Sequence, residues 1–296
     1  MSLRAAAIIG LAFLLSGAAL VFSAGAVAAE GALHPARQKV AEICPCIAHT
    51  SCGDASVTAP DGTRLNAWFY RPEHPNGAGI LLLHGLGSSR SDMVALGYFF
   101  LKAGYSVLEP DLRGHGTSGG YTTFGVLEAQ DVPRWADWLL RQQGVTRLYG
   151  FGASLGGSVL LEALRRESRF RGVIAESSFS DFAGIAHERW RRQLPFGLKW
   201  LTGSLVQSGF WWVRLRYSVD LTQASAVEAV RATKVPVYLI HGGADGKTLP
   251  DNSRRIARAN PAGTSLWIVP GAGHADIRAQ SRNEFEPRVL GWLTAR

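Results

Sequence analysis

Cysteine is scarce in this chain of 296 residues: only three are present, all between positions 44 and 52. They precede the folded domain, so none is a candidate nucleophile. In an oxidising compartment the run Cys44-Pro45-Cys46-Ile47-Ala48-His49-Thr50-Ser51-Cys52 predicts one local disulfide, most simply to Cys52, with one thiol left over. The same run with His49 is the alternative of a Cys3His metal site, but its first two cysteines are closer than in most zinc motifs. We therefore expect no metal.

Charged residues are also few, at 18% against 47% hydrophobic residues, which is typical of a globular protein rather than a disordered one. The formal net charge is +8, yet no block of consecutive basic residues marks a nucleic-acid-binding stripe. We expect general solvation with a preference for anionic surfaces, and no nucleic-acid partner. No internal repeat is visible, and the length suits one large domain or two small ones.

Charge is almost absent from the N-terminus, where Arg4 is followed by an apolar stretch over residues 5–29. Val27-Ala28-Ala29 before Glu30 is a small-residue cleavage site, and the pattern predicts a signal peptide. About twenty apolar residues also suffice to span a bilayer, so an uncleaved membrane anchor stays open as the alternative. Either interpretation predicts export: a periplasmic or secreted protein, or one anchored to the membrane.

Strand and helix patterns alternate from residue 55 onward. An antiparallel hairpin is expected over 55–59 and 64–70, and the apolar run 79–84 is typical of a strand buried on both faces of a parallel sheet. Further strands are expected at 105–108, 147–151, 172–176, 235–241 and 266–270, and helices at 91–103, 126–142, 155–166, 251–259 and 282–293. This alternation predicts a mostly parallel, twisted sheet with helices on both faces.

One long connection interrupts the alternation at about residues 180–232 and is rich in aromatic and basic side chains. A connection of this length predicts a helical lid, whose inward-facing aromatics would wall an apolar pocket. Its basic and aromatic composition would also suit contact with an anionic membrane.

A serine flanked by glycines stands between a predicted strand and a predicted helix. Gly152-Ala153-Ser154-Leu155-Gly156 follows the apolar run 147–151 directly. A sharp strand-to-helix turn of this form is the nucleophile elbow, which presents the serine hydroxyl at the edge of a sheet. Glycine is needed at the flanking positions because side chains there would collide with the bend. The pattern predicts Ser154 as a nucleophile.

A serine hydroxyl needs a base to take its proton and an acid to orient that base. Asp245 and His274 each follow a predicted strand, in the chain order Ser, Asp, His. Because carboxyl ends of parallel strands meet at one edge, the three side chains are expected to converge there. Glu176, at the end of another strand, is the alternative acid, and we favour Asp245.

The negative charge of a tetrahedral intermediate needs backbone N–H donors. We expect one from Leu155, at the start of the helix after the nucleophile. The second is expected from the loop His84-Gly85-Leu86-Gly87, and we assign it to Leu86, with Gly85 as the alternative. Buried structural hydrogen bonds are the expected role of His84 and His241, which precede glycines at strand ends. A hydrogen bond within its glycine-rich loop is the expected role of His115.

Together these motifs resemble the α/β-hydrolases of the branch that holds monoacylglycerol lipase-like and serine aminopeptidase-like enzymes, and within it capped bacterial hydrolases. The resemblance runs from about residue 55 to the end and is carried by His84-Gly85-Leu86-Gly87, Asp111-Leu112-Arg113-Gly114-His115-Gly116, Gly152 to Gly157, His241-Gly242 with Asp245, and Gly273-His274. It implies an α/β-hydrolase fold, a Ser154–His274–Asp245 triad, backbone oxyanion donors, no metal and no cofactor. One departure is that the proline after the acid loop comes a residue later, at Pro250.

The expected organisation is a signal peptide or anchor over 1–29, a cysteine-containing segment over 30–54, and a hydrolase domain over 55–296 that includes the lid. The expected activity is a serine hydrolase that cleaves carboxylic esters, less favourably thioesters or small amides, through an acyl-enzyme. Its partner would be a small ester or acyl substrate, with membrane association through the N-terminus or lid left open. An exopeptidase and a non-catalytic binding protein on this fold remain as alternatives. No oligomeric state is predicted.

Overall fold

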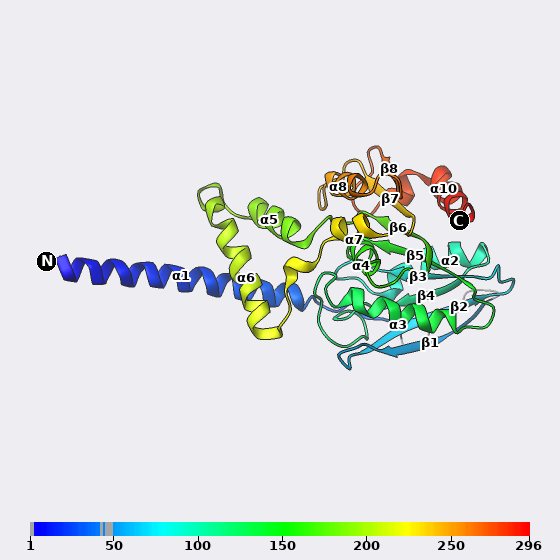
Figure 1. Ribbon diagram of the computed structural model, residues 1–296, viewed down its shortest axis with the longest axis horizontal. Helices are drawn as coiled ribbons and strands as arrows, with labels where there is room; N and C mark the ends of the chain where they lie inside the picture. Colours follow the sequence, from blue (N-terminus) through cyan, green and yellow to red (C-terminus); the bar gives the residue numbers. More distant parts are fainter. Residues whose placement is uncertain (1–2, 42–43, 45–49) are drawn as a thin grey trace.

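Eight strands form one sheet in the computed structural model, which describes residues 3–41, 44 and 50–296. The strand order is β1-β2-β4-β3-β5-β6-β7-β8 (Figure 1). The first two strands pair antiparallel with each other and β2 pairs antiparallel with β4, whereas all other pairs are parallel. The strands are β1 (Thr50–Thr58), β2 (Arg64–Pro72), β3 (Ala78–Leu83), β4 (Ser106–Pro110), β5 (Arg147–Ala153), β6 (Phe170–Glu176), β7 (Val237–Gly242) and β8 (Thr264–Val269). The predicted mostly parallel sheet with a hairpin at one edge is confirmed.

Helices cover both faces of this sheet. The helices of the described chain, including those that do not cover the sheet, are α1 (Leu3–Leu33), η1 (Arg90–Met93), α2 (Val94–Lys102), α3 (Glu128–Leu140), α4 (Leu155–Ala163), α5 (Phe182–Gln193), η2 (Phe196–Leu201), α6 (Thr202–Tyr217), η3 (Leu221–Gln223), α7 (Ala226–Ala232), α8 (Asp251–Ala259), α9 (Ile277–Gln280) and α10 (Arg282–Thr294). One face packs against α3, α4, α7 and α8, and the other against α2, α9 and α10.

The apolar strand β3 shows how the core is divided. Leu81 and Leu83 belong to the hydrophobic cluster on one face, while Ile80 and Leu82 belong to the cluster on the other. Successive side chains of a strand point to opposite faces, so a strand covered on both sides must be apolar throughout. Every residue of β3 is buried, as that requirement predicts.

The helical connection between β6 and α7 consists of α5, η2, α6 and η3, and we call α5, η2 and α6 the insertion helices. The chain leaves and returns at one point, where Asp181 and Ser225 form an isolated antiparallel bridge. Helix α7, within the range 180–232 expected for the insertion, instead packs on α4 and α8 beside the sheet. Helix α7 therefore lies with the helices that cover the sheet and not with the insertion helices.

Helix α1 projects from the body at the N-terminal end of the molecule, and α6 runs across it (Figure 1). It is long and apolar enough to cross a membrane, a property that a signal peptide and an anchor share.

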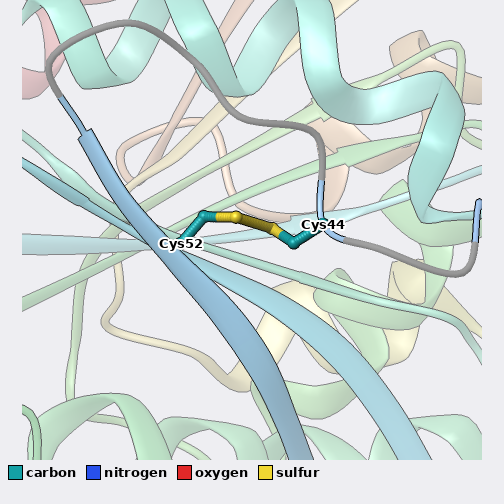
Figure 2. Close-up of a disulfide and its surroundings, with 2 residues drawn as sticks. All are labelled: Cys44 and Cys52. Carbon is teal, nitrogen blue, oxygen red and sulfur yellow. A yellow bond between two sulfur atoms is a disulfide. The ribbon is translucent and has the colours of Figure 1, made fainter.

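The local disulfide joins Cys44 and Cys52, whose Cα atoms lie 6.3 Å apart (Figure 2). This confirms the predicted bridge to Cys52. Cys44 is buried in the same hydrophobic cluster as Trp68 and Tyr70, so the bridge holds Cys44 against the α2 face of the sheet. Cys46 and His49, the other members of the alternative metal site, lie outside the described residues.

Candidate active site

The turn between β5 and α4 holds Ser154 in an uncommon backbone conformation. Its φ is +53° and its ψ is −115°, a region that non-glycine residues rarely occupy. A Cβ at Gly152 would collide with the carbonyl of Gly156, and one at Gly156 with the carbonyl of Leu83. The Ser154 N–H donates to the Glu176 carbonyl at 2.7 Å, which ties the turn to the neighbouring strand. The flanking glycines thus allow the sharp turn that leaves the Ser154 side chain half-buried at the sheet edge.

Three residues predicted from the sequence converge at this edge. His274 Nε2 lies 2.9 Å from Ser154 Oγ, and His274 Nδ1 lies 2.7 Å from Asp245 Oδ2. An ionised carboxylate only accepts hydrogen bonds, so Nδ1–H donates to Asp245 and leaves Nε2 free to accept the Ser154 hydroxyl proton. Asp245 is buried, whereas the His274 side chain is 17% exposed. The arrangement therefore has a buried acid, an orientated imidazole and an accessible hydroxyl.

The loop after β7 keeps Asp245 ionised. Its Oδ1 accepts the backbone N–H groups of Lys247 at 2.8 Å and Thr248 at 2.9 Å, while Oδ2 faces His274. Burial alone would raise the pKa of Asp245, but hydrogen bonds from His241, His274 and the Thr248 N–H hold that pKa below its ordinary value. The displaced Pro250 sits at the start of α8, beyond these contacts. The departure from the family pattern leaves the acid loop intact.

His241 lies beneath the acid loop. Its Nε2 is 2.9 Å from the Thr248 carbonyl and 3.3 Å from Asp245 Oδ2, and its Nδ1 is 2.6 Å from Ser253 Oγ. A carbonyl only accepts, so Nε2–H donates there and Nδ1 accepts from the Ser253 hydroxyl. The residue is fully buried and hydrogen-bonded. It supports the acid loop from below without contacting Ser154.

Glu176, the alternative acid, is placed differently. Its backbone carbonyl receives the Ser154 N–H, and burial raises the pKa of its side chain to about 7, although the charge of Arg278 opposes the shift. One of its carboxyl oxygens is buried without a hydrogen-bond partner among the described residues. The structure therefore brings Asp245, and not Glu176, into hydrogen-bond contact with His274.

The loop after β3 passes close to the elbow. A Cβ built on Gly85 would lie 3.5 Å from Ser154 Cβ, and Gly87 has a φ of +71°, which favours glycine. Leu86 between them is 39% exposed. The structure thus brings the predicted oxyanion loop beside Ser154, and the donor roles of the Leu86 and Leu155 N–H groups remain predictions.

Two histidines hold this loop in shape. His84 Nε2 accepts the Leu112 N–H at 3.0 Å, and its Nδ1–H donates to the Gly85 carbonyl at 2.8 Å. His115 Nε2 accepts the Gly87 N–H at 3.1 Å. Burial lowers the pKa of His84 to about 3, with a contribution from His115, so His84 is neutral and keeps one donor and one acceptor. Both serve as buried hydrogen-bonding residues.

A charged network that sequence patterns did not identify supports the loop that carries His115. The buried Arg113 guanidinium binds both oxygens of Asp131 at 2.8 Å and reaches Asp61 at 2.8 Å. Asp111 accepts the Thr117 N–H at 2.8 Å within the same loop. The signal for Arg113 was its place in a glycine-rich motif, but its partners lie 18 and 52 residues away.

The insertion helices contact the acid loop. The Arg192 guanidinium of α5 donates to the carbonyl of Gly246, next to the acid. At the base of the insertion, Phe182 stacks on Phe124 with ring centroids 3.8 Å apart. Within residues 3–41, 44 and 50–296, no group of three His, Cys, Asp or Glu side chains is placed to hold a metal ion.

Comparisons with known proteins agree with this architecture. The profile of the alpha/beta hydrolase family matches residues 80–285. The uncharacterised protein YfhR of Escherichia coli (strain K12) is 26% identical over 235 residues, which cover 76% of this chain and 74% of that protein. A thermostable monoacylglycerol lipase of Bacillus sp. (strain H-257) is 31% identical over 121 residues, 40% of this chain and 46% of that enzyme.

Among solved structures, a Pyrococcus furiosus esterase, Pf2001, superposes with a TM-score of 0.71 at 24% identity, over 89% of this chain and 99% of that one. A second crystal form of the same esterase gives a TM-score of 0.70 at 25% identity, over 89% and 97% of the two chains. The family profile spans well over half of the sequence. The chain belongs to the α/β-hydrolase family.

Proposed function

We propose that this protein is a serine hydrolase that cleaves carboxylic esters, with Ser154 as nucleophile, His274 as general base and Asp245 as the acid that orients it. The observation that carries the proposal is the continuous chain of contacts from Asp245 Oδ2 through the imidazole to Ser154 Oγ, at 2.7 and 2.9 Å. Similarity to an esterase and to a monoacylglycerol lipase supports the choice of an ester.

The reaction follows from these positions. Nε2 of His274 takes the hydroxyl proton as Ser154 Oγ attacks the ester carbonyl, and Asp245 stabilises the imidazolium that forms. The N–H groups of Leu155 and Leu86 would hold the oxyanion of the tetrahedral intermediate. Collapse expels the alcohol, which takes the proton from Nε2, and leaves Ser154 acylated. Water then attacks the acyl carbon while His274 Nε2 takes its proton. The second tetrahedral intermediate collapses, Ser154 Oγ leaves with that proton from Nε2, and the acid is released.

The insertion helices would cover the part of the substrate that does not react. Arg192 brings α5 to the acid loop, so a substrate group that leaves the carbonyl in that direction would lie under α5. The same machinery accepts thioesters and small amides, which differ only in the leaving group.

An exopeptidase would need a free carboxylate to bind the amine of its substrate. The acidic residues in and beside the insertion are already engaged. Asp181 accepts the Gly184 N–H and pairs with Arg255, Glu188 pairs with Arg192, and Asp220 accepts from Thr222 and faces Arg214. Ester cleavage needs no such group, so we favour it over aminopeptidase activity.

The test uses the full chain, a fluorophosphonate probe and short-chain activated esters. Wild-type protein should be labelled by the probe and turn over the esters, and Ser154→Ala should lose both, because the hydroxyl is the proposed attacking group. Ser56→Ala, an exposed serine on β1, is the matched control and should retain both. Ligand binding without labelling or turnover in the wild type would favour a non-catalytic binding protein and refute the proposal.

A further inference from the structure

Helix α1 has two parts with different surroundings. Every residue from Ala7 to Leu20 is exposed, and packing onto the body begins at Val21. The projecting part, Leu3–Leu20, is about 27 Å long at 1.5 Å per residue. The hydrocarbon core of a bilayer is about 30 Å thick. The length of apolar helix left outside the protein thus matches a bilayer.

The second part of α1 fits closely against α6. A Cβ on Gly25 would collide with Ser208 Oγ and with the backbone of α6, so only glycine permits this approach. Ser208 Oγ donates to the Val21 carbonyl at 3.3 Å. Phe22 packs edge-to-face on Trp212, with ring centroids 6.4 Å apart. These contacts form a seam that involves residues on the N-terminal side of Ala29.

The end of α1 is fastened by polar contacts as well. Both oxygens of Glu30 are bound, one by Trp212 Nε1 at 2.7 Å and the other by the Tyr217 hydroxyl at 2.8 Å. Leu33 is fully buried, and its carbonyl accepts the Thr122 N–H at 3.0 Å. Cleavage after Ala29 would remove the whole Gly25 seam and expose the matching surface of α6. The fit indicates that α1 is part of the mature fold.

The outward surface of the insertion carries large apolar side chains that are exposed to solvent. We call it the insertion face; its residues and exposed fractions are Phe196 (90%), Leu198 (45%), Trp200 (77%), Trp211 (51%) and Leu215 (70%). Residues four apart share one side of a helix, so Trp211 and Leu215 form a single stripe on α6. Ser208, which meets α1, lies three residues before Trp211 in α6, so this stripe borders the seam with α1. Exposed apolar groups clustered in this way mark an interaction surface.

Positive charge surrounds the insertion face. Residues 182–217 contain six Lys or Arg and one Glu, with the basic residues at positions 189, 191, 192, 199, 214 and 216. A hollow of about 560 Å³ between α5 and the start of α6 is lined by His187, Glu188, Arg191, Lys199, Trp200 and Thr202. Aromatic and cationic side chains together suit the boundary between lipid headgroups and acyl chains, and the excess of cations selects anionic lipid.

We propose that α1 is retained as a membrane anchor held by α6, and that the insertion face docks on the surface of an anionic bilayer. Helix α6 crosses α1 where its projecting part begins (Figure 1). A bilayer that surrounds Leu3–Leu20 therefore meets the insertion face without any rearrangement. The proposal goes beyond ester hydrolysis and does not depend on it.

The first measurement concerns the anchor. The full chain with its native N-terminus is produced in bacterial cells, the membranes are washed with alkaline carbonate, and the intact mass of the mature protein is determined. We expect the protein in the washed membranes with residues 1–29 present. A mature chain that begins near Glu30, or one released by the wash, overturns the proposal.

The second measurement concerns docking. The full chain is reconstituted into phosphatidylglycerol-containing vesicles with or without lipids brominated near the headgroup, which quench tryptophan close to the membrane surface. Trp200→Phe and Trp211→Phe should each lower the quenched fraction of the emission. Trp292→Phe is the control, since Trp292 stacks on Tyr238 on the far side of the sheet. Equal quenching in all three variants and the wild type would show that the insertion face does not touch lipid.

The charge requirement is tested in the same vesicles. Arg191→Glu combined with Lys199→Glu should reduce quenching to the level found in phosphatidylcholine vesicles, because the reversed charges repel the anionic surface. Arg254→Glu combined with Arg258→Glu on α8 makes the same change of charge elsewhere and should have no effect. Equal behaviour of the two double variants would refute anionic docking. Ser154→Ala should dock like the wild type, so failure of ester hydrolysis and failure of docking are distinguishable.

Discussion

The sheet edge that carries Ser154 and the insertion that meets α1 are built in opposite ways. At the sheet edge Ser154, His274 and Asp245 find their partners inside the protein: Asp245 alone receives two backbone N–H groups and a histidine. On the insertion the largest apolar groups, such as Phe196 and Trp200, face outward. A site of the first kind is complete in the folded chain, since its charges are already paired. A surface of the second kind buries its apolar side chains only when it contacts another apolar surface or a lipid bilayer.

The largest expected effect is on turnover, and it comes from replacing Asp245, the proposed acid at the sheet edge. Asp245→Asn should lower kcat by about 10⁴-fold, because an amide in place of the carboxylate favours the wrong imidazole tautomer. Steady-state turnover of an activated ester measures the loss. Glu176→Gln is the matched control, because that carboxyl has no hydrogen bond to His274, and it should change kcat far less. The reverse ranking would identify Glu176 as the acid.

The sequence made the sheet-edge site predictable because its signals are local. A glycine two residues to either side of Ser154 reports the bend of one turn, and Asp245 and His274 are each found by their position just after an apolar strand. Parallel strands then bring them together by topology alone. The β1–β2 hairpin and the bridge to Cys52 were predictable for the same reason.

What could not be predicted depends on contacts between distant segments. Glu30 meets Trp212 and Tyr217 across 182 and 187 residues, and no periodicity in either segment indicates that contact. The pairing of Arg113 with Asp131 is hidden in the same way. The packing of α7 on α4 and α8 is likewise not indicated by the sequence of α7 itself.

A smaller effect, on the stability of the insertion, is expected from a substitution in the seam between α1 and α6. Gly25→Leu places a side chain where Ser208 and the α6 backbone already lie, and overpacking of this kind costs about 1–3 kcal/mol. The insertion should loosen while the sheet stays folded. Limited proteolysis in detergent should therefore cut faster within residues 182–217 and no faster elsewhere.

Gly17→Leu is the control for that substitution. It lies in the same helix, but a Cβ there meets nothing within 4 Å. It should leave the protease pattern unchanged and keep the helix apolar. If both variants behave alike, α1 and α6 are not in contact, and the insertion does not depend on the N-terminal helix.

The smallest expected effect concerns the buried core, where the carboxyl group of Glu109 is held in a different protonation state from that of Asp245. Glu109 is fully buried, and neither of its oxygens has a hydrogen-bond partner among the described residues. Burial raises its pKa to about 8, although Arg90 opposes the shift. The same kind of side chain is thus held neutral in one place, while Asp245 is held ionised in another by the donors around it.

The sign of the resulting pH dependence follows from proton uptake. Between about pH 5 and pH 8 the folded protein keeps the Glu109 proton that the unfolded chain has lost, so the free energy of unfolding falls as pH rises. Glu109→Gln removes this contribution and should raise the thermal midpoint at pH 8 more than at pH 5, with a shallower slope between them. Part of the slope should remain, because burial also raises the pKa values of Glu162 and Glu176. Glu228→Gln, at an exposed site on α7, should leave the slope as it is; an unchanged slope in Glu109→Gln would mean that Glu109 is already ionised in the core.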